Sequence, residues 1–434
     1  MSAPVEREPV SPVGGPDEPT LELQSAHLSR PPLLRLFPAL SEGRFRLFWL
    51  SMMPATLAIQ MGAVAIGYAA FAISGSAAVL GGVSLATGLP MMLLGLVGGV
   101  VADRAPRRLV LIGTQSTLGL GATAVAALAL TNNLAVWHLY ALGLVQGTAF
   151  AFNMPARQAF IGELAPTPLL RSAIALNNSG LNFTRIAGPS LGGTLLAIPF
   201  IGIGGVFAAM AAMYCVVVVA LLRLRERGSG GQSRGRGGWE QLVEGLRHIR
   251  ANPVLFGLLT IGFVPLFFGI PFQTLLPLFA QRVHEAGALG LGIMTAAVGV
   301  GALCGSVMIA IIARGQGLGR LQMALGVGFG VALAAFALSP TLVVATICLA
   351  FVGFTSAGYA AVNETLVMAA TTSQFHGRVM SVYLLSFGLM PLATFPQAWI
   401  ADHIGGPTTI TGAGGVVVLS VFLSQLIPAY RRLG

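Results

Sequence analysis

The fold is decided by the stretch Gly99-Val-Val-Ala-Asp103-Arg104-Ala-Pro106-Arg107-Arg108, which places a compact cluster of charge between two long apolar runs. The runs cover residues 78–101 and 109–130, and a helix of about 20 apolar residues crosses a bilayer. Arginines beside a membrane helix bind lipid phosphates, and an acid there can bond the N-terminus of a neighbouring helix. The stretch therefore predicts a tight turn between two membrane-spanning helices.

The composition of the whole chain agrees with this interpretation. Of 434 residues, 55% are hydrophobic and 9% are charged, whereas soluble domains carry about 25% charged residues. This excludes a soluble enzyme and a nucleic-acid binder. The three cysteines and six histidines are scattered, so we expect no disulfide, metal, cofactor or catalytic site. A phosphate-binding nucleotide loop is also missing from the sequence.

Outward from the charged stretch, the sequence contains twelve apolar runs of membrane-spanning length. They are residues 47–74, 78–101, 109–130, 134–156, 172–198, 200–222, 254–280, 288–313, 320–338, 342–367, 376–402 and 409–430. We therefore predict an all-α membrane protein with twelve transmembrane helices.

The arginines predict the orientation. All 24 basic residues are arginine, and 22 of them fall in alternate connecting segments that share one side of the membrane. The exceptions are Arg282 and Arg185, which lies within a span. The positive-inside rule then places both termini in the cytoplasm and the protein in the inner (plasma) membrane.

The chain divides into four predicted parts. These are a disordered tail (1–44), a six-helix bundle (45–222), a cytoplasmic linker (223–252) and a second six-helix bundle (253–434). The linker begins Gly/Arg/Ser-rich and ends in an amphipathic segment that we expect to lie as a helix on the membrane surface.

A repeat relates the two bundles. Arg104 and Arg314 are 210 residues apart, as are Asn153 and Asn363. Two pseudo-symmetric six-helix halves around a central cavity are typical of secondary transporters.

The stretch 99–108 resembles the loop signature of the major facilitator superfamily, with Pro106 in place of a glycine. The resemblance implies that Gly99, Asp103, Arg104, Arg107 and Arg108 form a latch between the two bundles. The segment Gly188-Pro189-Ser-Leu-Gly192-Gly193 is similar to the fifth-helix motif of drug:proton antiporters, although its two upstream glycines are Ala175 and Thr184 here. Small residues also allow close helix packing.

Further segments resemble the bacterial enterobactin-exporter and macrolide-efflux branch. They are Phe45-Arg46-Leu-Phe48-Trp49, Asn153-Met-Pro155-Ala-Arg157-Gln158 and His376-Gly-Arg378-Val-Met-Ser381. The resemblance runs from about Phe45 to Arg432 and implies the major facilitator fold with a proton-coupled export function.

Arg185 is the most informative single residue. It follows Ser172 by 13 positions, which is about 20 Å along a helix and near the middle of the bilayer. An arginine there is costly unless it faces a cavity or a partner. We expect it to bind substrate anions or to pair with an acid; a structural bond to backbone carbonyls is the alternative.

The family architecture implies that the first, fourth, seventh and tenth spans surround the cavity. With two residues of the fifth span, the candidate cavity residues are Gln60, Tyr68, Gln146, Asn153, Asn182, Arg185, Phe267, Gln273, Phe354, Tyr359 and Asn363. Aromatic and amide groups suit bulky amphiphiles. Acids are scarce, which favours a neutral or anionic cargo over a cation. Glu364 and Asp402 are the candidate proton-coupling residues.

We therefore predict a monomeric secondary transporter that exports amphiphilic small molecules, such as drugs, siderophores or metabolites, by proton-coupled alternating access. Its expected partners are the cargo, protons and membrane lipids. Three alternatives stay open. A lipid or lysolipid flippase would move lipid after reconstitution, an importer would concentrate its substrate inward, and a sensor would bind a ligand without moving it.

Overall fold

The computed structural model describes the chain except for residues 1–36, 225–237, 313–316, 373–374, 377, 380–381, 384–388 and 425–434. The described part is helical and contains no strand. The predicted disordered tail lies outside the described residues up to position 36. Its last residues do not fit that prediction, because Pro38–Ser41 form a 3-10 helix and the first long helix begins at Gly43.

Six long helices form the first bundle. They are α3 (Gly43–Ser74), α4 (Ala77–Arg104), α5 (Arg107–Leu130), α6 (Val136–Leu164), α7 (Leu170–Ala197) and α8 (Gly202–Arg223). The stretch 99–108 forms the predicted turn, with α4 ending at Arg104 and α5 beginning at Arg107.

The second bundle also contributes six spans. The seventh span of the chain is made of α10 (Pro253–Gly269), α11 (Phe272–Leu278) and a π-helical end, Phe279–Val283. It is interrupted at Pro271, which has no backbone N–H to donate. The other five spans are α12 (Gly287–Ile312), α13 (Leu318–Ala337), α14 (Leu342–Ala369), α16 (Met390–Ile404) and α17 (Gly406–Ser424).

Nine of the described spans are long and apolar enough to cross a membrane by themselves. The other three are α6, α7 and α16. Polar side chains such as Asn153 in α6 and Asn177 and Arg185 in α7 interrupt two of them, and α16 has 15 described residues. Together they complete the twelve-span, all-α fold predicted from the sequence.

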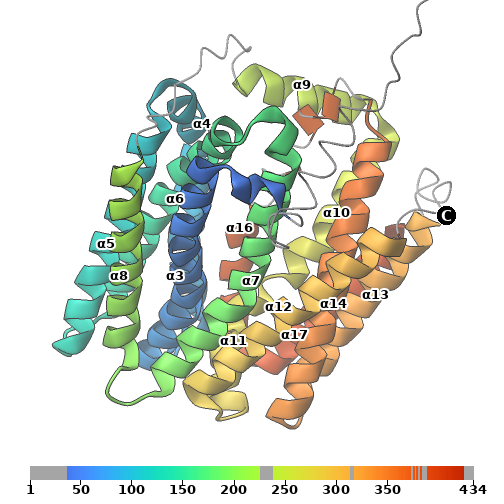
Figure 1. Ribbon diagram of the computed structural model, residues 1–434. Coiled ribbons are helices and arrows are strands. Elements are labelled where there is room, and N and C mark those ends of the chain that lie inside the picture. Colours follow the sequence, from blue (N-terminus) through green and yellow to red (C-terminus); the bar gives the residue numbers. More distant parts are fainter. Residues whose placement is uncertain are drawn as a thin grey trace, which may run out of the picture.

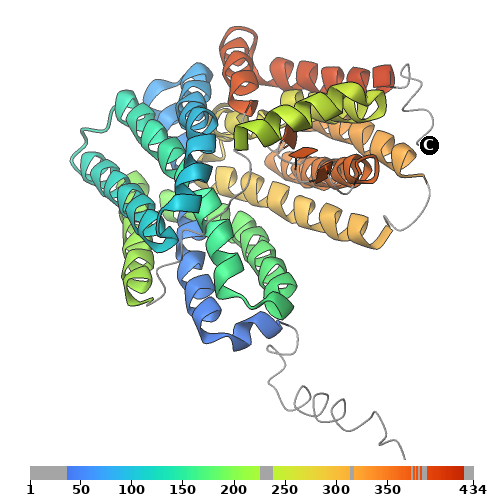
Figure 2. The same ribbon diagram turned by 90° about the horizontal axis from the view of Figure 1, so that it is seen from above.

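The two bundles lie side by side (Figure 2), and one end of both carries most of the described arginines, including Arg104, Arg107 and Arg108. We call this the arginine-rich end, and the other the opposite end. The second part of the linker forms helix α9 (Gly238–Ala251), which lies across the arginine-rich end (Figure 1). There it contacts protein, because Glu244 pairs with Arg378 at 3.1 Å and His248 stacks on Phe375. Its contact with the bilayer stays a prediction.

The repeat is visible in matching hydrogen bonds. In the first bundle, Asn153 of α6 donates to Thr114 of α5 at 2.8 Å. In the second, Gln322 of α13 donates to Asn363 of α14, also at 2.8 Å. Each bond joins the third and fourth helices of its bundle. The two asparagines at the 210-residue offset therefore connect the same pair of helices in each half.

The most extensive contacts between the bundles are made by two helix pairs, α4 with α16 and α7 with α12, and α11 adds smaller contacts with α3 and α4. Glycines bring the backbones close. A Cβ atom added at Gly81 would lie 2.6 Å from Cβ of Ala398, and one at Gly193 would lie 2.6 Å from Cα of Gly292. All four residues belong to the halves of their helices nearer the opposite end. The bundles are therefore packed tightly against each other at that end.

We expect Gly193→Ala to weaken this packing, because the added methyl group would meet the backbone of α12. The population with the opposite end closed should fall about tenfold, for a cost of about 1–3 kcal/mol from overpacking. Labelling of an introduced cysteine at that end by a membrane-impermeant maleimide measures the change. Gly95→Ala is the matched control, since nothing lies within 4 Å of an added Cβ there; equal labelling of both variants would contradict the prediction.

Candidate functional site

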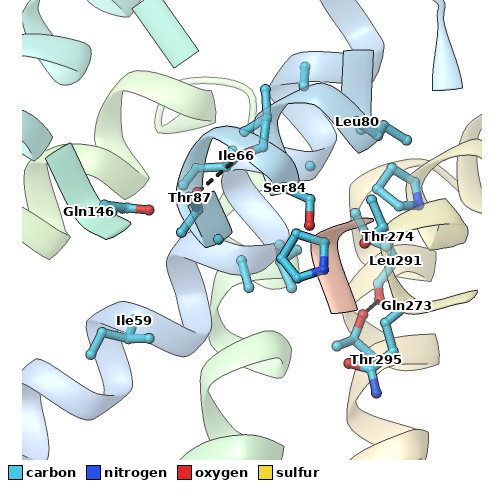
Figure 3. A pocket seen from close by; sticks show the side chains of 18 of the residues that line it. Ile59, Ile66, Leu80, Ser84, Thr87, Gln146, Gln273, Thr274, Leu291 and Thr295 are labelled. Atoms are coloured by element: carbon cyan, nitrogen blue, oxygen red, sulfur yellow. Dashed lines mark hydrogen bonds between the residues drawn. The ribbon is translucent and has the colours of Figure 1, made fainter. Parts of the chain in front are cut away.

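A cavity with two adjoining lobes lies between the bundles. The first, which we call the apolar lobe, has a volume of about 410 Å³. Figure 3 shows residues of its wall, among them Ile59, Ile66 and Leu80 from the first bundle and Leu291 from the second. Its polar groups are hydroxyls and amides, including Gln146 and Gln273.

The second lobe, which we call the Arg185 lobe, has a volume of about 380 Å³. Gln60 and Arg185 come from the first bundle, and Gln273 and Ser356 come from the second. Ala63, Gln273 and Thr295 line both lobes, so the two spaces lie next to each other between the bundles. Movement of one bundle against the other must therefore change the shape of the cavity.

Arg185 reaches the cavity because of glycines on both sides of its helix. It lies at the middle of α7, which contains 28 residues. At Gly188 an added Cβ would collide with Cβ of Gln60, so α7 lies directly on α3. At Gly299 an added Cβ would lie 3.0 Å from the backbone oxygen of Arg185, so α12 also approaches closely. The side chain itself is exposed.

Four of the predicted cavity residues, Gln60, Gln146, Arg185 and Gln273, line the two lobes. Asn153, Tyr359 and Asn363 do not, because they are 5%, 1% and 0% exposed inside their own bundles. The lining of the two lobes also leaves out the other four predicted residues, which are Tyr68, Asn182, Phe267 and Phe354.

The predicted latch residues divide into two groups. Arg107 and Arg108 are bound within the first bundle, Arg107 to Glu163 at 2.5 Å and Arg108 to the carbonyl oxygens of Leu221 and Leu222 at 2.7 Å. Asp103 and Arg104 are exposed at the end of α4. Gly99 has open space where a Cβ would be. This surface is accessible in the conformation described here.

The fifth-helix motif has two packing functions in this structure. Gly188 and Gly192 face α3, where added Cβ atoms would crowd Gln60 and Met61. Gly193 faces α12 across the bundle interface, and the carbonyl oxygen of Pro189 lies close to Gly292. The motif thus packs one short segment of α7 against α3 of its own bundle and against α12 of the other bundle.

At the opposite end, Asp402 of α16 binds the N-terminus of α4 across the bundle interface. Its carboxylate accepts hydrogen bonds from Ser76 Oγ at 2.5 Å, the Ala77 N–H at 2.6 Å and the Ala78 N–H at 2.9 Å. These N–H groups begin α4 and have no partner within the helix. A carboxylate is stabilised there by hydrogen bonding and by the helix dipole.

Arg282 binds the other side of the same turn. Its guanidinium donates to the carbonyl oxygen of Gly75 at 2.5 Å and lies over the ring of Phe71. Gly75 ends α3 with a φ of +63°, a left-handed conformation that glycine adopts without strain. We call Asp402, Arg282 and the turn Gly75–Ala78 the clasp. The sequence had marked Arg282 as the exception to the positive-inside pattern but gave no sign of its partner.

Glu364, the other predicted proton-coupling residue, is exposed on α14. It lies one helical turn beyond Ala360, which lines the Arg185 lobe. It is therefore beside the cavity toward the arginine-rich end and outside its lining.

Two six-helix bundles with a cavity of apolar and polar side chains between them are the architecture of a membrane transporter. The chain belongs to the major facilitator family described as transmembrane secretion effector, which matches residues 35–431. It is a multi-pass membrane protein and not an enzyme.

Curated relatives are efflux proteins. The chain is 24% identical to macrolide efflux protein A of Streptococcus pyogenes, over 83% of this chain and 90% of the relative. It is 25% identical to the multidrug efflux pump Tap of Mycolicibacterium fortuitum, covering 81% and 87%. It is 27% identical to the enterobactin exporter EntS of Shigella flexneri, covering 68% and 70%.

Solved structures agree on the fold. An inward-facing, unoccupied bacterial homologue of the human lysosomal transporter Spinster matches with a TM-score of 0.70 at 16% identity, covering 90% of this chain and 97% of that one. The nucleoside transporter NupG matches with a TM-score of 0.69 at 13% identity, covering 88% and 98%.

We expect Asp402→Asn to loosen the opposite end, because the amide loses the negative charge that strengthens all three bonds to α4. For a partly exposed group the cost is about 1–2 kcal/mol, or about tenfold in the closed population. Spin labels at Phe200 and Leu338, which are 87% and 69% exposed, should report a longer distance between the bundles. The control is His403→Gln, whose ring bonds its own helix; the same shift in both variants would refute the role of Asp402.

Proposed function

We propose that the protein exports neutral or anionic amphiphilic small molecules across the plasma membrane by proton-coupled alternating access. The observation that carries the proposal is the cavity between the bundles, in which an apolar lobe adjoins the Arg185 lobe beside a tightly packed opposite end. Clefts lined by apolar surface with a few polar groups are the usual form of small-molecule sites. The names of the relatives, which refer to macrolide, multidrug and enterobactin efflux, support an export function.

In the proposed orientation the arginine-rich end faces the cytoplasm, in accord with the positive-inside rule. The described conformation is then the one that loads cargo from the cytoplasm, since the bundles are clasped at the outer end. Asp103 and Arg104, exposed here, would engage the second bundle when the cytoplasmic end closes.

Proton coupling is proposed to act through Asp402 and Glu364. Asp402 faces the N-terminus of α4 and lies near Arg282. A proton arriving from outside would neutralise the carboxylate and weaken its bonds to that helix terminus. Release of the clasp would open the outer end. Glu364 lies beside the cavity toward the cytoplasmic end, where the proton would leave.

Transport by the purified full chain in proteoliposomes tests the proposal. A panel of cationic, neutral and anionic amphiphiles is followed with an imposed proton gradient, with and without a protonophore. We expect neutral or anionic compounds to cross the membrane in the direction opposite to the proton flow. This movement should stop when the protonophore is added. Movement of a fluorescent lipid, with none of the panel transported, would instead identify a flippase.

We expect Glu364→Gln to uncouple transport from protons, because the amide cannot release a proton to the cytoplasm. The ratio of efflux rates with and without a tenfold proton gradient should fall toward one, while cargo binding stays within about twofold. The control variant is Glu285→Gln, which removes an exposed acid beyond the seventh span at the opposite end. A normal gradient response in Glu364→Gln would assign coupling to other acids.

A further inference from the structure

The charge of the residues that line the cavity restricts the charge of the cargo. Arg185 carries a positive charge at the middle of α7, and it is one of the residues that line the Arg185 lobe. The lining residues of the two lobes include neither Asp nor Glu among the part of the chain that the structure describes. The nearest acid along α14, Glu364, is a full turn of about 6 Å beyond the lobe.

A positive charge without a counter-charge in such a place attracts anions strongly. The surrounding protein and lipid have a low dielectric constant, which strengthens charge–charge interactions and focuses the field into the cavity. Burying the guanidinium at mid-membrane depth is costly, and an anion in the lobe would offset part of this cost. A cationic molecule would meet repulsion there and find no carboxylate.

The groups around Arg185 are suited to an oxyanion. A guanidinium presents paired N–H donors that match the two oxygens of a carboxylate. Gln60 and Gln273, one from each bundle, line the same lobe, and their amide N–H groups can donate. Ser356 adds a hydroxyl from α14.

The apolar lobe determines the rest of the cargo. Its wall is mainly aliphatic, and it adjoins the Arg185 lobe at Ala63, Gln273 and Thr295, which line both. A molecule with its anionic group near Arg185 would therefore place an apolar body between Ile66 and Leu291. Its two ends would be held in lobes of about 380 and 410 Å³.

We propose that the physiological cargo is an amphiphilic organic anion, with one oxyanion group bound by Arg185 and an apolar body in the apolar lobe. This rests on the proposed export function and narrows its substrate class. Outward movement of an anion is also favoured by a membrane potential that is negative inside.

Binding of matched probes to the full chain in nanodiscs tests the assignment. The probes are 7-diethylaminocoumarin-3-carboxylate and its neutral primary amide, which share one apolar body, and fluorescence anisotropy gives their dissociation constants. We expect the carboxylate to bind at least tenfold more tightly than the amide. Arg185→Gln should remove that preference and leave amide binding within about twofold, and Arg185→Lys should retain most of it.

Arg171→Gln is the matched control variant. It removes the same charge from an exposed position on the same helix, 14 residues away and so about 21 Å from Arg185. Equal binding of the two probes, no binding of the carboxylate, or equal losses in the Arg171 and Arg185 variants would overturn the anion assignment. Proton-driven transport of the amide in those cases would leave the export proposal standing, whereas tight carboxylate binding without any transport would refute export alone.

Discussion

At Gly193 and Gly292 two helices from different bundles meet backbone to backbone, with no side chain between them. In a bilayer, where lipid tails compete with apolar side chains, such close packing is a main source of helix association. A second close approach occurs at Gly81, where the methyl group of Ala398 and the backbone of Phe395 face the glycine. These contacts bring Ser76 within hydrogen-bond distance of Asp402. They also place Gln60 of the first bundle and Gln273 of the second in the lining of one lobe. The clasp and both lobes therefore depend on glycine and alanine residues that let the helices approach closely.

Because the contacts are small and lie toward one end, they can separate as a unit. Packed interfaces tend to be bistable and do not deform gradually. The clasp adds charged hydrogen bonds to this interface at the ends of α3 and α4. Protonation can remove the charge of Asp402, whereas a glycine contact cannot be titrated. The interface thus supplies the tight fit, and the clasp supplies a group through which protons can act on it in the proposed cycle.

The number of spans and the position of Arg185 could be predicted from the sequence, since apolar length and depth along a helix are local quantities. The assignment of Asn153 and Asn363 to the cavity could not succeed in this way. A helix in a bundle has one face toward lipid, one toward the interior of its bundle and one toward the cavity. The sequence does not distinguish a polar residue on the interior face from one on the cavity face. Their partners, Thr114 and Gln322, lie on other helices. The partner of Arg282 is a backbone carbonyl, which no side-chain pattern reveals.

The two ends of the molecule differ in a way that bears on the direction of the cycle. At the opposite end the acid Asp402 is bound to a helix terminus of the other bundle. At the arginine-rich end the acid Asp103 is exposed, although Arg107 and Arg108 beside it are bound within their own bundle. Asp103 and the N-terminus of α4 that Asp402 binds are at opposite ends of one helix. A tilt of α4 that brings Asp103 toward the second bundle therefore carries Ser76 away from Asp402. Under this geometry only one of the two acids is engaged at a time, and α4 links the two ends of the molecule in the proposed alternating-access cycle.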